Sequence, residues 1–319
     1  MKAFLFPGQG SQAPGMGNFL FENFKTAQHT FEEASDAIQF NLKKLCFTGT
    51  EQELALTENT QPALLCVSTA TARVLTQDLG VKPTITAGHS IGEYSSMVVA
   101  KSLAFGDAMR AVRLRGKAMQ AAVPVGTGGM TATLGLSDEQ AQFLCDWAVK
   151  NSGFGPLSPA NYNCEGQIVI SGNLKCLEWL KLNFKAEILP GEAKRAKLIP
   201  LQVSAPFHCE MMRPAQEQME LFLSSVHFAD SQIGIVQNVN AAIETKADLL
   251  RKNLIEQVSA PVRWTQSMQT LKTTGTALCF EVGHGNVVKG LLKKIDSEFF
   301  TVHSTSTLAD IKAIESLST

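Results

Sequence analysis

Apolar residues along the chain form short uninterrupted runs and longer periodic segments, which predict strands and helices respectively. Residues 2–6 predict a short buried strand, and residues 84–87 predict a second one. Segments with helical patterning lie between and after these strands, at residues 32–45, 62–79 and 93–100. Strands separated by segments of helical length favour an α/β fold with a largely parallel sheet.

Residues 125–200 show a different order of elements, beginning with the glycine-rich stretch 126–129. Ser137 and Gln140 form a capping-box pattern at the start of one predicted helix. The predicted order is strand, helix, strand, strand, helix, strand, at residues 130–134, 137–150, 160–163, 167–171, 174–184 and 194–201. This βαββαβ order is typical of a ferredoxin-like unit. We therefore expect residues 125–200 to form a small subdomain inserted into a larger α/β domain made of residues 1–124 and 201–319.

The composition excludes several classes of protein. The chain is 45% hydrophobic and carries 28 Lys and Arg against 29 Asp and Glu, so it can form a core but has no overall basic field for nucleic acid. Its seven cysteines never form a C-x-x-C pair, which argues against a disulfide framework or a zinc site. No run of 18 apolar residues predicts a membrane span. We expect a cytoplasmic protein that binds neither metal nor membrane.

Residues 88–92 match the pattern G-x-S-x-G between a predicted strand and a predicted helix. In that setting Ser90 lies on a sharp turn with an exposed hydroxyl, and the amide of Ile91 points to where an oxyanion would form. The alternative is a chance match in an ordinary loop. The strand–turn–helix context favours a nucleophile.

Six histidines could supply the base that a serine nucleophile needs. His208 is the best placed, because it ends the extended run 201–207 and precedes a predicted helix, as at the carboxyl end of a strand. His89 adjoins Ser90 but is expected to point elsewhere. No acidic residue between Ser90 and His208 occupies an obvious strand end, which weakens the case for a hydrolase triad.

Arg115 lies on the apolar face of a predicted helix that begins at Asp107 as its cap and runs to about residue 122. A guanidinium that faces inward needs an anion. Two partners remain possible at this point, a carboxylate of the protein itself or a carboxylate of a substrate. The glycines Gly8 and Gly10 weakly resemble a dinucleotide fingerprint, but a turn that presents backbone amides near Ser90 fits them better.

Together these motifs resemble the malonyl-CoA:acyl carrier protein transacylase family, and the likeness spans nearly the whole chain. The resemblance rests on residues 6–12, 88–93, 114–116 with 119–120, 205–208, and Gln257 ahead of 261–264. One departure is His284, which stands between Gly283 and Gly285 where the family usually has proline.

The resemblance implies a hydrolase-like core, an inserted ferredoxin-like subdomain and a Ser-His dyad in place of a triad. His208 would activate Ser90, and the backbone carbonyl of Gln257 would orient the imidazole. The amides of Gln9 and Ile91 would stabilise the oxyanion. The implied reaction is ping-pong transfer of a malonyl group through malonyl-Ser90, for fatty acid synthesis, without metal or redox cofactor.

Substrate selection is also implied by the resemblance. Arg115 would bind the malonyl carboxylate, with Met119 on the same helix, and the bulk of Phe207 would exclude an α-methyl group. The partners would be malonyl-CoA and acyl carrier protein, and the enzyme would be a monomer.

Because acyl carrier protein is typically acidic, we expect a local basic surface on this chain. The basic residues that could form it are Lys194, Arg195, Lys197, Lys289, Lys293 and Lys294, although a solvated face is the better explanation for any single one of them. Three other functions remain open: a hydrolase of acyl-CoA or acyl carrier protein, an acyltransferase of a polyketide pathway, and a non-catalytic scaffold. Arg115 argues against general hydrolysis, because most hydrolysed acyl chains lack a second carboxylate.

Overall fold

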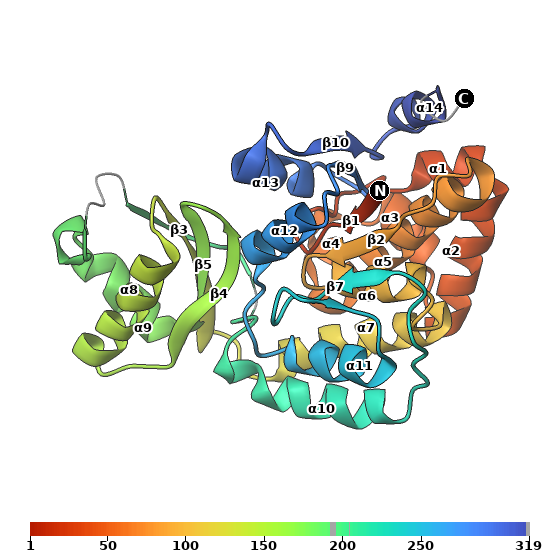
Figure 1. Cartoon of the computed structure of the whole chain (residues 1–319). Helices are drawn as coiled ribbons and strands as arrows, with labels where there is room; N and C mark the ends of the chain where they lie inside the picture. Colours follow the sequence, from red (N-terminus) through yellow and green to blue (C-terminus); the bar gives the residue numbers. More distant parts are fainter. Residues whose placement is uncertain (192–195, 204, 317–319) are drawn as a thin grey trace.

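The computed structural model describes residues 1–191, 196–203 and 205–316, which form a mixed α/β structure with two sheets (Figure 1). The larger sheet has the order β10-β9-β1-β2-β7-β8. Its strands are β1 (Lys2–Phe6), β2 (Ile85–Gly88), β7 (Gly234–Val236), β8 (Ile243–Glu244), β9 (Leu278–Glu281) and β10 (Thr301–Ser304). All neighbours are parallel except β7 and β8. The predicted parallel sheet is therefore present, with one antiparallel strand at its edge.

Both faces of the larger sheet are covered, which explains why its strands read as continuous apolar runs. Phe4 and Phe6 of β1 pack into one hydrophobic cluster, and Ala3 and Leu5 pack into another on the opposite face. The first cluster includes residues from α1 (Asn18–Asn23), α2 (Lys25–Ile38), α3 (Leu42–Thr48), α4 (Glu51–Ala55), α5 (Thr57–Arg73), α6 (Gly92–Val99), α7 (Phe105–Ala121), α10 (Arg213–Ser224), α11 (Ala247–Glu256) and α14 (Leu308–Ser316). The second includes residues from α12 (Trp264–Thr273) and α13 (Val287–Asp296).

The smaller sheet is antiparallel and has the order β4-β5-β3-β6. Its elements, in chain order, are β3 (Gly128–Leu134), α8 (Asp138–Ser152), β4 (Leu157–Cys164), β5 (Gln167–Asn173), α9 (Leu174–Asn183), the 3-10 turn η2 (Ala186–Ile188) and β6 (Lys197–Pro200). The predicted capping box at Ser137 and Gln140 is confirmed. The sheet meets the rest of the chain through β4, where the backbone of Tyr162 donates a hydrogen bond to Val262 over 2.9 Å.

Three local predictions are wrong. The helix predicted at 32–45 is two helices, because Gln39 takes a left-handed conformation and Asn41 caps α3 by accepting a hydrogen bond from the amide of Lys44. Asp107 does not cap α7, since that helix begins earlier and buries Phe105.

The third wrong prediction concerns the strand that was expected to lead to His208. The described residues of 201–207 form a loop instead, followed by the 3-10 turn η3 (Glu210–Met212) and α10. This loop leaves the smaller sheet after Pro200, and Pro206 has no amide hydrogen to donate to a strand neighbour. In the described part of the chain, no helix has both the length and the apolar composition that crossing a membrane requires.

Candidate active site

Ser90 lies on a tight turn between β2 and α6, as the sequence pattern predicts. Its φ of 52° is in the left-handed region, which a non-glycine residue seldom adopts. Glycine is required on both sides, because a Cβ atom on Gly88 would overlap the backbone of Gly92, and one on Gly92 would overlap the carbonyl of Phe6. The parallel strands β1, β2 and β7 end at this same edge, so Gln9, Ser90 and Asn238 all follow carboxyl ends of strands.

His208 contacts Ser90 across the edge of the sheet, with 2.7 Å between Ser90 Oγ and His208 Nε2. The other ring nitrogen, Nδ1, donates to the backbone carbonyl of Gln257 over 2.9 Å and lies 3.2 Å from that of Ala260. A proton on Nδ1 leaves Nε2 as the acceptor for the serine hydroxyl. Burial, with the nearby positive charge of Arg115, lowers the pKa of His208 to about 3. The imidazole is therefore a neutral base held by carbonyl oxygens, without a carboxylate.

Arg115 is 1% exposed and lies beside this pair. Its Nη2 donates to Gln257 Oε1 over 2.8 Å and lies 3.3 Å from Ser90 Oγ, while its Nε has no hydrogen-bond partner. Within the described ranges no Asp or Glu forms an ion pair with Arg115. Of the two partners that the sequence left open, an internal carboxylate is thus not found among the described residues. The buried guanidinium can accept an anion that enters the site.

Glu93 and Asn238 also contribute to the site, and sequence reasoning missed both. The side-chain amide of Gln257 donates to Glu93 Oε2 over 2.6 Å and to the carbonyl of Ser90 over 2.9 Å. Asn238 accepts from the amide of Ser90 and donates to the carbonyl of Gly88, both over 2.7 Å. Burial raises the pKa of Glu93 to about 8, so this carboxyl group is protonated at neutral pH. A lone acid at the start of an apolar helix could have indicated Glu93, whereas nothing in the sequence marks Asn238.

Four further residues were assigned to the site from the sequence, and the structure shows the surroundings of each. The amides of Gln9 and Ile91 have no hydrogen-bond acceptor among the described residues, so both are available to a ligand. Phe207 is buried next to His208. Met119 is buried too, and its sulfur accepts a hydrogen bond from Gln61 Nε2 over 3.7 Å.

His89 does point away from Ser90, as expected, and its Nε2 lies 2.8 Å from Asn163 Oδ1 on β4. This contact joins the nucleophile turn to the smaller sheet.

The basic residues expected to face acyl carrier protein are only partly described. Lys194 and Arg195 lie outside the described residues. Lys197 is exposed on β6, and three lysines are exposed on α13, namely Lys289, Lys293 and Lys294. In the parts of the chain that the structure describes, no three His, Cys, Asp or Glu side chains come together to hold a metal ion.

Comparison with known proteins gives consistent matches along nearly the whole chain. Residues 3–312 match the family model described as acyl transferase domain. The chain is 41% identical over 300 residues to the malonyl CoA-acyl carrier protein transacylase of Bacillus subtilis (strain 168), covering 94% of this chain and 92% of that one. The transacylase of the same name from Escherichia coli (strain K12) is 41% identical over 293 residues, covering 92% of each chain.

Solved structures agree with these sequence matches. A malonyl-transacylase in complex with a type II PKS acyl-carrier protein has a TM-score of 0.91 and 39% identity, covering 99% of both chains. The malonyl CoA-acyl carrier protein transacylase of Coxiella burnetii has a TM-score of 0.91 and 34% identity, covering 100% of this chain and 98% of that one. With its Ser-His pair, its unpaired buried arginine and these relatives, the chain belongs to the acyl transferase domain family.

Proposed function

We propose that this chain is a malonyl-CoA:acyl carrier protein transacylase that supplies malonyl groups to fatty acid synthesis. The observation that carries the proposal is the position of Arg115. Its buried guanidinium has no carboxylate partner among the described residues, and its Nη2 lies 3.3 Å from Oγ of the nucleophile Ser90. A site with this arrangement favours an acyl group that carries its own carboxylate. Malonyl is the acyl group named in the relatives.

In the first half-reaction, His208 Nε2 accepts the proton of the Ser90 hydroxyl as the oxygen attacks the thioester carbonyl of malonyl-CoA. The amides of Gln9 and Ile91 donate to the resulting oxyanion, which is commonly worth about 2.7–4 kcal/mol per donor. The C–S bond then breaks, and the imidazolium returns its proton to the leaving thiolate. The low pKa of His208 favours this return, because the charged imidazole is unstable in the buried site.

Gln257 is proposed to position the whole site. Its carbonyl accepts from His208, its side-chain oxygen accepts from Arg115, and its side-chain nitrogen donates to Glu93. A protonated Glu93 does not neutralise Arg115, so the guanidinium keeps its full charge for the malonyl carboxylate.

In the second half-reaction, the phosphopantetheine thiol of acyl carrier protein gives its proton to His208 and attacks the malonyl-Ser90 ester. The ester C–O bond then breaks, the malonyl thioester leaves on the carrier protein, and His208 returns the proton to Ser90 Oγ. One solved relative is a complex with an acyl-carrier protein, which supports this partner. Lys197 and the lysines of α13 are the exposed cations proposed to meet its acidic surface. The reaction as written uses neither metal nor redox cofactor.

We further infer that residues 125–200 are a ferredoxin-like subdomain inserted between 1–124 and 201–319. The βαββαβ order and the antiparallel arrangement β4-β5-β3-β6 support this. We also expect a monomer that works in the cytoplasm. Seven free, buried cysteines fit a reducing compartment.

Intact-protein mass spectrometry after brief mixing with malonyl-CoA tests the proposal. A single malonyl adduct should form on the wild type, remain absent from Ser90→Ala, and form poorly with acetyl-CoA. Added acyl carrier protein should discharge it. Release of free malonate without carrier protein would indicate a hydrolase, and no adduct with no CoA release would indicate a scaffold. A polyketide carrier protein that discharges the adduct faster than a fatty acid carrier protein would favour the polyketide pathway.

A further inference from the structure

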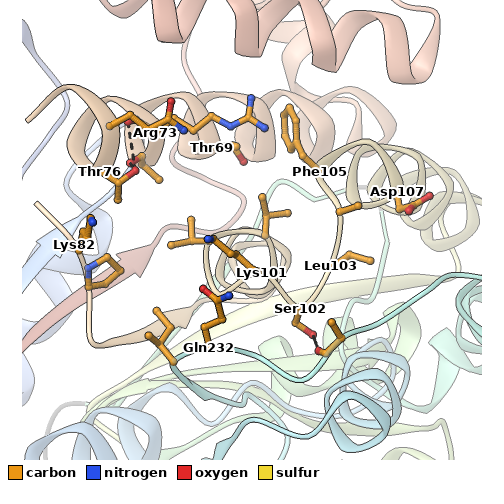
Figure 2. A pocket seen from close by; sticks show the side chains of 18 of the residues that line it. Thr69, Arg73, Thr76, Lys82, Lys101, Ser102, Leu103, Phe105, Asp107 and Gln232 are labelled. Carbon is orange, nitrogen blue, oxygen red and sulfur yellow. Dashed lines mark hydrogen bonds between the residues drawn. The ribbon is translucent and has the colours of Figure 1, made fainter. Parts of the chain in front are cut away.

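A large pocket lies at the amino edge of the larger sheet, at the opposite end of α6 from Ser90. Its volume is about 850 Å³, and it is bounded by the end of α5, the π-helical segment η1 (Val74–Asp78), the last turn of α6, the first turn of α7 and the segments leading into β2 and β7 (Figure 2). The eight residues of α6 span roughly 12 Å, so the pocket is separate from the active site. Among the described residues, its lining includes none of Ser90, His208 and Arg115.

One wall of the pocket is apolar. Val98 and Val99 come from α6, Leu103 comes from the segment before α7, Phe105 begins α7, and Ile233 comes from the segment before β7. Val98, Val99 and Ile233 are only partly buried, so apolar surface remains open to an occupant. A cavity of this volume with a mainly apolar wall and a few polar groups is typical of small-molecule sites.

The pocket also carries two cations without counter-ions. Lys82 and Lys101 are exposed, and in the described part of the chain neither ammonium group forms a hydrogen bond or an ion pair. The other charged groups of the lining are already paired: Arg73 with Glu33 and Asp107 with Arg110, each over 2.6 Å. The unpaired charge of the lining is therefore positive, which favours an anion.

A buried hydroxyl points to the same conclusion. Thr69 lines the pocket and is 1% exposed, yet its Oγ1 has no hydrogen-bond partner. Two other threonines of this helical stretch do bond backbone carbonyls, Thr71 to Val67 and Thr76 to Ala72, each over 2.8 Å. Because buried polar groups are normally satisfied, the Thr69 hydroxyl is a polar group in the pocket wall that no described residue uses. Figure 2 shows Thr69 on one side of the pocket and Lys101 on another.

We propose that this pocket binds an amphipathic monoanion, namely a medium-length aliphatic chain that ends in a carboxylate. The chain covers the apolar wall where Val98, Val99 and Ile233 are only partly buried. The carboxylate accepts hydrogen bonds from Lys82 and Lys101, whose flexible side chains can follow it. An alkyl phosphate shares this chemistry, so the experiment compares both head groups.

The test measures binding of decanoate, decyl phosphate, decanol and decyltrimethylammonium to the full chain by ligand-observed NMR, below the concentrations at which they form micelles. We expect decanoate to bind at least about tenfold more tightly than the neutral and cationic probes. A tighter complex with decyl phosphate than with decanoate would assign the site to phosphate esters and overturn the carboxylate proposal. Equal binding of all four probes would reduce the pocket to a non-specific apolar surface.

Two double variants test whether decanoate binds in this pocket. Lys82→Glu combined with Lys101→Glu changes exposed positions that should fold normally, and it should weaken decanoate about tenfold. The matched charge change at Lys150→Glu and Lys185→Glu, in the smaller sheet unit, should have no effect. Malonylation of Ser90 should proceed at the wild-type rate in both double variants. Unchanged decanoate affinity in the pocket variant overturns the proposal.

The active site is a competing location for a carboxylate, because Arg115 could bind it. Arg115→Ala should therefore retain decanoate affinity, and loss of binding in this variant would place decanoate at the active site. Val99→Trp, which fills the pocket, should abolish binding without slowing malonylation of Ser90.

Discussion

The two edges of the larger sheet carry polar groups that are held in opposite ways. At the carboxyl edge, Ser90, His208 and Gln257 are linked by hydrogen bonds of 2.7–2.9 Å within the protein interior. At the amino edge, Lys82 and Lys101 are exposed and lack partners among the described residues. Bond making requires groups fixed to within a fraction of an ångström, while binding an anion tolerates mobile cations. The difference agrees with the proposals that the carboxyl edge carries out chemistry and the amino edge binds an anion.

The two arginines near these edges test that difference most directly. Arg115 is buried and forms no ion pair within the described ranges, whereas the Arg73 side chain is 26% exposed and paired with Glu33. Arg115→Ala should lower kcat/KM for malonyl-CoA by about 10²–10³-fold, because it removes a buried charge-assisted contact. Its preference for malonyl-CoA over acetyl-CoA should nearly vanish in the mass-spectrometric acylation assay.

Arg73→Ala is the matched control. It should keep the preference for malonyl-CoA and destabilise the protein by at most about 1 kcal/mol, the usual range for a partly exposed ion pair. A full preference for malonyl-CoA in Arg115→Ala would remove the guanidinium from substrate selection.

The next largest loss of activity is expected when Glu93 is changed, because Glu93 acts on the site through Gln257. Glu93→Ala deprives the Gln257 amide of its acceptor, so we expect KM for malonyl-CoA to rise and kcat to fall, each by about tenfold. Glu93→Gln keeps an acceptor oxygen and mimics the protonated acid, and it should retain most activity at pH 7. Glu281→Gln changes another buried carboxyl group, which bonds the amides of Val288 and Lys289, and it should leave both constants unchanged. Equal loss in all three variants would reduce Glu93 to a structural residue.

The pH dependence of stability follows from the raised pKa of Glu93. The unfolded chain loses this proton near pH 4.5, whereas the folded protein keeps it up to about pH 8. Between those values the folded state binds the extra proton, so its stability falls as pH rises. Thermal unfolding followed from pH 5 to pH 8 should show a smaller fall in Tm for Glu93→Gln than for the wild type. An unchanged slope would mean that Glu93 is ionised in the folded protein.

A smaller effect, on the choice between methylmalonyl-CoA and malonyl-CoA, separates two buried phenylalanines. Phe207 adjoins His208, and Phe105 lies at the amino-edge pocket. Phe207→Ala should raise the rate with methylmalonyl-CoA relative to malonyl-CoA by about tenfold, because it makes room for one methyl group. Phe105→Ala should lower stability without changing this ratio. Wild-type turnover of methylmalonyl-CoA as fast as malonyl-CoA would exclude a selective role for Phe207.

The smallest expected effect is a change in the free energy of unfolding at two threonines of α5. Thr71→Val removes a buried hydrogen bond to the carbonyl of Val67 and should cost about 1 kcal/mol. Thr69→Val removes a hydroxyl that has no partner, so its stability should match or exceed that of the wild type. Chemical denaturation measures both. A loss of about 1 kcal/mol at Thr69 would reveal a hidden partner and weaken the argument for a ligand there.

Local patterns predicted much of this protein correctly. The strand at the N-terminus, the capping box at Ser137 and the turn that carries Ser90 all depend on neighbours within a few residues, which a sequence displays directly. The wrong predictions also have local causes, because a single residue can end a helix or strand that the apolar pattern continues. Asn41 caps a new helix inside an apparently continuous one, and Pro206 interrupts an apparently extended strand.

By itself, the sequence determined the alternation of strands and helices, the nucleophile turn and an inward-facing Arg115. Only the tertiary structure decided that no described carboxylate pairs with Arg115, that Glu93 accepts a hydrogen bond from Gln257, and that an open pocket occupies the opposite edge of the sheet. These features join residues up to 164 positions apart, as between Glu93 and Gln257. Periodicity reports which face of an element is buried, but the folded chain alone sets which distant groups meet there.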